Sequence, residues 1–114
     1  MSKKSFLNHN HSDWENTKNY DEVMLAIGRH RKLIMNKFLN LDQRKIKVTV
    51  QAAKEIIGDI LDHCKLKVED KNWPILLGFA SRKDGTIDFK LLMNIYKDRV
   101  NKIMTAPKAK ILYI

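Results

Sequence analysis

Apolar residues recur at intervals of three and four along much of the chain, which is the spacing of one face of an α-helix. The first such segment predicts one long amphipathic helix from Tyr20 to Leu41, with Asp21 at its N-cap or in its first turn. Its apolar face consists of Tyr20, Val23, Met24, Ile27, Ile34, Met35, Phe38 and Leu41. Residues 1–19 are polar and lack helical spacing, so they are expected to form a flexible N-terminal arm.

The helical period is lost between Leu41 and Gln51. Ile46, Val48 and Val50 alternate with polar residues there, which predicts a short strand. Helical spacing resumes over residues 52–64, and Thr49 stands where a residue that caps this second helix would lie.

The second half of the chain repeats this order of elements. After a polar linker over residues 65–72, Pro74 suits the first turn of a short helix. Asp84-Gly85 is a turn signal, and a further amphipathic helix is expected over residues 89–104. Residues 105–114 are expected to form an extended C-terminal tail. The sequence therefore predicts two helix-loop-helix units in one domain over residues 20–104.

The turn lies in the segment FASRKDGTIDFKLL, residues 79–92, which resembles the second half of an EF-hand pair, as in calmodulin-like proteins and myosin light chains. Gly85 takes the sixth loop position and Ile87 the eighth, where the family has an apolar residue that pairs with the partner loop. The resemblance implies an all-α, EF-hand-like pair with a short two-strand bridge that joins Val48 to Ile87. In the first unit, Asp42 takes the first loop position, but that loop is about one residue short and has no glycine.

The calcium-binding positions of this loop have been lost. Calcium needs about six to eight oxygen ligands, including a bidentate Glu at the end of the loop. Asp84 and Asp88 stand at the fifth and ninth positions, but Ala80, Arg82 and Leu91 stand at the first, third and twelfth. We therefore expect no bound metal and no cofactor. The alternative is that Asp84-Gly85 forms only a hairpin or interhelical turn.

Charge adds a further feature. The 114 residues carry 22 Lys and Arg against 13 Asp and Glu, a net charge of +9, which favours an acidic partner: nucleic acid, anionic lipid or an acidic protein. The excess is confined to residues 29–47 and 97–110. The candidate partner-binding residues are the basic side chains of the first segment, Arg29, Arg31, Lys32, Arg44, Lys45 and Lys47.

An apolar groove is a second candidate site for a partner. Four methionines, Met24, Met35, Met93 and Met104, are spaced on the apolar faces of the first and last long helices. Flexible methionine surfaces adapt to an inserted amphipathic helix, although core packing is the commoner use of such residues.

The sequence gives little support for a disulfide, a metal site, catalysis or a membrane span. The one cysteine, Cys64, excludes an intrachain disulfide and is expected to be a buried, inert thiol, since the adjacent His63 does not share its helix face. His9 and His11 lack further ligands at metal-binding spacing. No catalytic motif occurs, so an enzyme is not expected, and no apolar run is long enough to span a membrane.

These features together predict a calcium-independent, EF-hand-like adaptor or structural protein that binds an acidic or amphipathic protein partner. A cytoplasmic, cytoskeletal setting is expected, with the ciliary axoneme as one example, because tubulin is acidic. The alternative is a small basic helical protein that binds nucleic acid through phosphate contacts.

Overall fold

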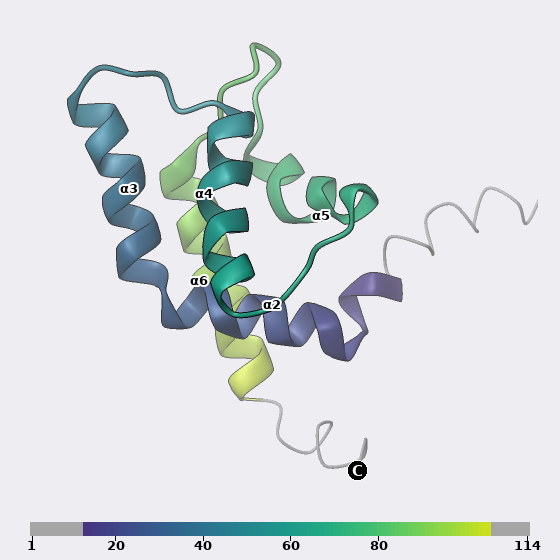
Figure 1. The fold of residues 1–114 in the computed structure, drawn as a ribbon. Coiled ribbons are helices and arrows are strands. Elements are labelled where there is room, and N and C mark those ends of the chain that lie inside the picture. Colours follow the sequence, from purple (N-terminus) through teal and green to yellow (C-terminus); the bar gives the residue numbers. More distant parts are fainter. Residues whose placement is uncertain (1–12, 106–114) are drawn as a thin grey trace, which may run out of the picture.

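The computed structural model describes residues 13–105 of the chain, and these residues confirm the all-α class. The elements are α2 (Lys18–Arg29), α3 (Arg31–Gln43), α4 (Val50–His63), η1 (Asp70–Asn72), α5 (Trp73–Leu77), η2 (Gly78–Ala80) and α6 (Phe89–Met104) (Figure 1). α3 and α4 run side by side, and α6 lies behind them (Figure 1). α2 crosses at the end opposite the connection between α3 and α4 (Figure 1). No described helix has the length and apolar character needed to cross a bilayer.

The prediction of one helix from Tyr20 to Leu41 is wrong, because the chain bends at His30. His30 has φ −106° and ψ 20°, and it ends α2 and begins α3. The bend allows α2 to pack on α6 while α3 packs beside α4. Gly28 permits the close approach of α2 and α6, since a Cβ atom at this position would lie 3.1 Å from both γ-carbons of Val100. Tertiary packing thus divides a segment whose apolar period runs through the bend.

The folded part of the chain begins earlier than predicted. Trp14 was placed in the flexible arm, but only 8% of it is exposed. Its ring packs edge-on against Tyr20 with centroids 5.1 Å apart, and its Nε1 donates to Oδ1 of Asn19 at 3.0 Å. The boundary at residue 19 is therefore wrong for residues 13–19. The rest of the arm and most of the tail, residues 1–12 and 106–114, lie outside the described residues.

Each long helix that begins after a loop has a side-chain cap. Thr17, rather than Asp21, caps α2, and Asp21 lies in the first turn. Thr49 caps α4 as predicted by accepting from the Ala52 amide at 3.0 Å. Pro74 lies in the first turn of α5, also as predicted. Local sequence signals therefore define the helix starts well.

The core is formed by the inner faces of all these helices. Phe38 of α3 stacks on Phe89 of α6 with ring centroids 5.4 Å apart. Tyr96 is fully buried, and its hydroxyl donates to the Leu76 carbonyl at 2.8 Å. Burial raises the pKa of Tyr96 far above its ordinary value, so this hydroxyl stays protonated and keeps its hydrogen bond.

The strand and the two-strand bridge are not formed as predicted. Within residues 13–105 the loops contain only isolated bridge pairs, Thr49 with Thr86 and Ser81 with Ile87. Two backbone hydrogen bonds of 2.9 Å hold the loops together, from the Ile87 amide to the Val48 carbonyl and from the Val50 amide to the Gly85 carbonyl. A longer strand has no room, because α4 begins at Val50.

α3 and α4 end in the same way. Lys45 and Lys65, one residue beyond each C-cap, both have φ 60°, in the left-handed region. The residue after each donates its amide back to the last turn at 2.9 Å, Ile46 to Leu41 and Leu66 to Leu61. This is the Schellman ending, in which glycine is usual because a side chain is disfavoured there by about 1–2 kcal/mol.

Lys65→Gly should therefore stabilise the protein by about 1 kcal/mol, since glycine removes the left-handed strain. The measurement is urea unfolding followed by circular dichroism. Lys65→Ala is the matched control, because it removes the same charge but retains a Cβ atom. Equal stability of the two variants would contradict the strain assigned to this helix end.

Candidate functional site

The loop over residues 80–91 is closed on itself by backbone hydrogen bonds. The Asp88 amide donates to the Ala80 carbonyl at 2.8 Å, and the Arg82 amide donates to the Thr86 carbonyl at 2.8 Å. Gly85 has φ 88°, a conformation that favours glycine. The Asp84-Gly85 turn thus closes a hairpin between two helices, and the same hairpin also contacts the loop that follows α3.

Asp84 is engaged by Thr86. Its Oδ1 accepts from the Thr86 hydroxyl at 2.6 Å and from the Thr86 amide at 3.0 Å. These hydrogen bonds, the hydroxyl first, lower the pKa of Asp84 below its ordinary value. Asp84 is therefore held as a carboxylate that already has two donors.

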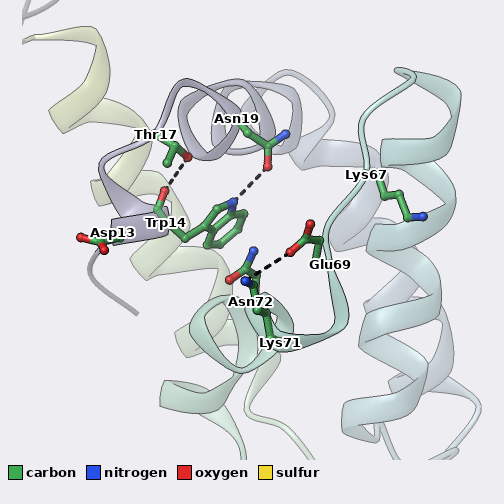
Figure 2. A pocket seen from close by; sticks show the side chains of 8 residues that line it. All are labelled: Asp13, Trp14, Thr17, Asn19, Lys67, Glu69, Lys71 and Asn72. Carbon is green, nitrogen blue, oxygen red and sulfur yellow. Dashed lines mark hydrogen bonds and ion pairs between the residues drawn. The ribbon is translucent and has the colours of Figure 1, made fainter. Parts of the chain in front are cut away.

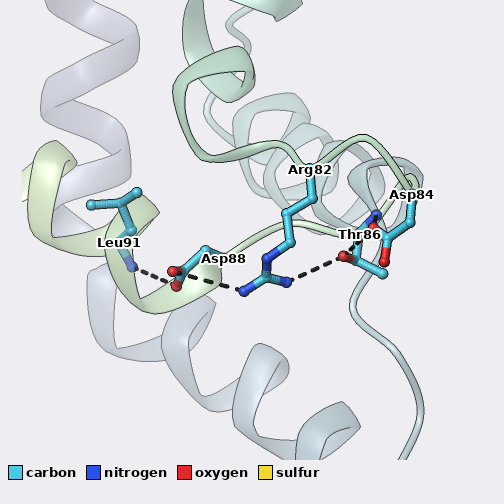
Figure 3. Close-up of polar contacts among 5 residues, drawn as sticks. All are labelled: Arg82, Asp84, Thr86, Asp88 and Leu91. Carbon is cyan, nitrogen blue, oxygen red and sulfur yellow. Dashed lines mark hydrogen bonds and ion pairs between the residues drawn. The ribbon is translucent and has the colours of Figure 1, made fainter.

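Arg82 places a positive charge among the polar groups of the loop. Its Nη1 donates to Oγ1 of Thr86 at 3.2 Å, and its Nη2 lies 3.8 Å from Oδ2 of Asp88 (Figure 3). The other oxygen of Asp88 accepts from the Leu91 amide at 3.1 Å and so caps α6. The guanidinium thus joins Thr86 and Asp88 across the loop.

Ala80, Ile87 and Leu91 have no side-chain oxygen, and the hydroxyl of Ser81 donates to the Leu77 carbonyl at 2.8 Å. Ala80 is buried, and Leu91 is 41% exposed at the start of α6. Ile87 is buried against the core. Across residues 13–105 there is no cluster of three or more His, Cys, Asp or Glu side chains suited to a metal ion. The loop is built to connect helices through its own hydrogen bonds.

The six predicted basic residues are all exposed but do not form one patch. Three of them, Arg29, Arg31 and Lys32, lie at the bend between α2 and α3; we call them the corner cluster. The other three, Arg44, Lys45 and Lys47, lie just beyond the end of α3; we call them the loop cluster. Since α3 has 13 residues, the two clusters are about 20 Å apart.

None of these side chains forms an ion pair within residues 13–105, although Lys47 is close enough to Asp84 to help lower the pKa of that carboxyl. The ion pairs among the described residues are Lys54–Asp70 at 3.8 Å, Lys71–Glu69 at 3.6 Å and Arg82–Asp88 at 3.8 Å. Neither cluster takes part in them. The loop cluster also adjoins a hollow of about 440 Å³, whose charged lining combines Lys47, Arg82 and Lys90 with Asp42, Asp84 and Asp88.

The second basic segment, residues 97–110, is different. Arg99 lies over the Phe79 ring, 4.6 Å from its centroid, and donates to the Ile75 carbonyl at 3.3 Å. This charge holds α6 to α5 rather than facing a partner. Residues 106–110 lie outside the described residues.

The predicted methionine groove is closed. Met24 is fully buried and Met93 is 5% exposed, and both belong to the core. Met35 is half-buried against that core, and Met104, at the last turn of α6, is 67% exposed. The four residues do not line one surface, because α2, which carries Met24, packs onto α6 and α4, and core packing, the commoner use of such residues, holds for Met24 and Met93.

Cys64 contacts a histidine other than the neighbouring His63. Its Sγ lies 3.6 Å from Nε2 of His30, at the bend between α2 and α3. His63 instead bonds through Nδ1 to the Asp59 carbonyl at 2.9 Å. The thiol is half-buried rather than fully buried, and its contact joins the end of α4 to the bend. His9 and His11 lie outside the described residues.

A hollow that the sequence did not predict lies beside Trp14 (Figure 2). It has a volume of about 690 Å³ and is lined by Asp13, Trp14, Thr17, Asn19, Lys67, Glu69, Lys71 and Asn72. Its polar groups are largely engaged with one another, as in the Trp14–Asn19 hydrogen bond and the Lys71–Glu69 pair. A tryptophan inside a polar segment was the available signal for this packing.

Comparison of the chain with models of known protein families and with curated proteins found no match.

The pKa of the Asp84 carboxyl should be found below 3.8, because hydrogen bonds from Thr86 favour its charged form. The resulting stabilisation is present above the unfolded pKa and is lost as pH falls through the lower, folded value. Carbon-detected NMR titration of wild type measures this directly. Thr86→Val removes the hydroxyl donor and should return the pKa toward 3.8; a wild-type value at or above 3.8 would contradict the hydrogen bonds.

Proposed function

We propose that this protein is a calcium-independent, EF-hand-like adaptor or structural protein that binds an acidic surface of a protein partner through its corner and loop clusters. The observation that carries the proposal is the exposure of six basic side chains that form no ion pair among the described residues. Solvated helix surfaces usually mix the two signs of charge. Unneutralised basic clusters at both ends of one rigid helix favour an acidic partner.

The EF-hand-like part of the proposal is supported by the pairing of the two units. α3 and α4 flank one loop, and α5 with η2 and α6 flank the other. Their loops exchange backbone hydrogen bonds around Thr49 and Thr86. Arg82 supplies the positive charge at the loop, so no ion is needed to hold it.

The closed groove directs the partner to the outside of the molecule. Since α2 covers α4 and α6, an inserted helix would first have to displace buried side chains such as Met24. Binding through exposed charge requires no such change. An acidic cytoskeletal lattice such as the microtubule suits this mode of binding, and we propose it as the partner, in the cytoplasm or the ciliary axoneme.

Nucleic acid is the alternative partner, and the structure offers it phosphate contacts without stacking. Phe38 is the aromatic residue of the basic segment, but it is fully buried against Phe89. Recognition of single strands uses exposed aromatic rings. We therefore favour protein and treat nucleic acid as an outcome of the binding test.

Calcium should neither bind nor alter the fold, because Ala80, Arg82 and Leu91 supply no oxygen ligand. Isothermal titration calorimetry in low salt should show no binding. A dissociation constant below about 10⁻⁴ M, within the range of working EF-hands, would contradict the proposed loop.

Charge reversal tests the clusters. Changing Arg29, Arg31, Lys32, Arg44, Lys45 and Lys47 to Glu should abolish binding to microtubules in a sedimentation assay and leave helical circular dichroism unchanged. Exposed substitutions usually shift stability by only about 0.5 kcal/mol each. Wild-type binding should also weaken toward physiological salt, where the screening length is about 8 Å.

Separate corner and loop triple variants should each weaken the binding. The matched control is the triple variant Lys18→Glu, Lys67→Glu, Lys71→Glu, which changes the charge equally beside the Trp14 hollow. Gel shifts with duplex and single-stranded nucleic acid use the same proteins. Unchanged microtubule binding by the six-residue variant would overturn the proposal, and binding to nucleic acid alone would replace it with the alternative.

A further inference from the structure

A groove of about 540 Å³ runs between the outer sides of α3 and α4. It is lined by Asn36, Lys37, Asn40 and Leu41 of α3 and by Ala52, Glu55 and Ile56 of α4. Leu41 and Ile56 are only partly buried, so the floor of the groove is apolar and open to solvent.

α3 carries more apolar surface than the core uses. Only Ile34 and Phe38 are buried in this helix. Leu33 is 48% exposed, and it shares a helix face with Asn36, Lys37 and Asn40 because these residues follow it by three, four and seven positions. The apolar floor therefore extends along α3 toward the corner cluster.

The α3 side of this groove is positively charged, whereas α4 contributes the carboxylates of Glu55 and, one turn further along, Asp59. The corner cluster lies at one end of α3, the loop cluster lies beyond the other, and Lys37 lies between them. The one acidic residue of the lining, Glu55, already accepts from Nε2 of Gln51 at 3.1 Å. A ligand with carboxylates is complementary to the α3 side if these carboxylates face Lys37 and the two clusters, away from Glu55, at a spacing that reaches both ends of a helix of 13 residues.

We infer that the α3–α4 groove binds an acidic amphipathic helix of three to four turns from the protein partner. Its apolar residues would pack on Leu33, Leu41 and Ile56, and its carboxylates would face Lys37 and the two clusters. A helix of about 13 residues spans the roughly 20 Å between the clusters. The inference rests on the proposed function and names the element of the partner that is bound.

Two synthetic peptides of 14 residues test it. One places Leu at helical i, i+3, i+4 and i+7 positions among Glu residues, and the other has the same composition without the helical period. Fluorescence anisotropy with the full chain should show that the periodic peptide binds at least tenfold more tightly. A charge-swapped periodic peptide, with Lys for Glu, should not bind.

Leu33→Asp should weaken binding of the periodic peptide at least tenfold, because it places a carboxylate on the apolar floor. Leu91→Asp is the matched control: Leu91 has similar exposure, 41% against 48%, but lies at the start of α6, and its variant should stay within twofold of wild type. Lys37→Glu should weaken binding without changing the helical circular dichroism.

The outcomes separate this inference from the proposed function. If both acidic peptides bind equally and Leu33→Asp has no effect, charge alone acts, and the groove is overturned while the acidic partner stands. If neither peptide binds but the charge-reversal assay succeeds, the groove is again overturned. If both experiments fail, the proposed function falls as well.

Discussion

The packing of α2 against α6 determines most of what this protein presents to its surroundings. It depends on Gly28, whose missing side chain leaves room for Val100, and on the burial of Met24. Full burial of such a side chain contributes about 1.5–3 kcal/mol. Because α2 crosses the bundle, the chain bends at His30, the methionine surface is closed, and Arg29, Arg31 and Lys32 are brought to the outer corner.

The other end of the molecule is organised by its two loops. Backbone hydrogen bonds join the loops, and Arg82 bridges Thr86 and Asp88 within one of them. A guanidinium is attached to the chain and cannot dissociate from the loop as a metal ion does. The outer surface of α3 lies between these two ends and carries exposed Leu33 together with exposed basic side chains.

Much of the candidate site could be predicted residue by residue, but its arrangement could not. The exposure of the basic side chains could be predicted from their charge and from the small number of acidic residues near them in the sequence. Their division into two clusters depends on the length of α3 and on the bend at His30, neither of which leaves a mark in hydrophobic spacing. The α3–α4 groove could not be predicted, because the sequence does not distinguish whether Leu33, Leu41 and Ile56 lie in the core or on an exposed apolar surface.

The sequence by itself determined the helical class, the capping of α4 by Thr49, the place of Pro74, and the turn at Asp84-Gly85, because these depend on interactions within a few residues. Tertiary structure alone decided the break at His30, the burial of Trp14, the reduction of the expected strands to isolated bridges, and which methionines are buried. The physical reason is that the spacing of apolar residues identifies the apolar face of a helix but does not determine which other segment packs against that face. Contacts between distant segments, such as Gly28 with Val100, make that choice.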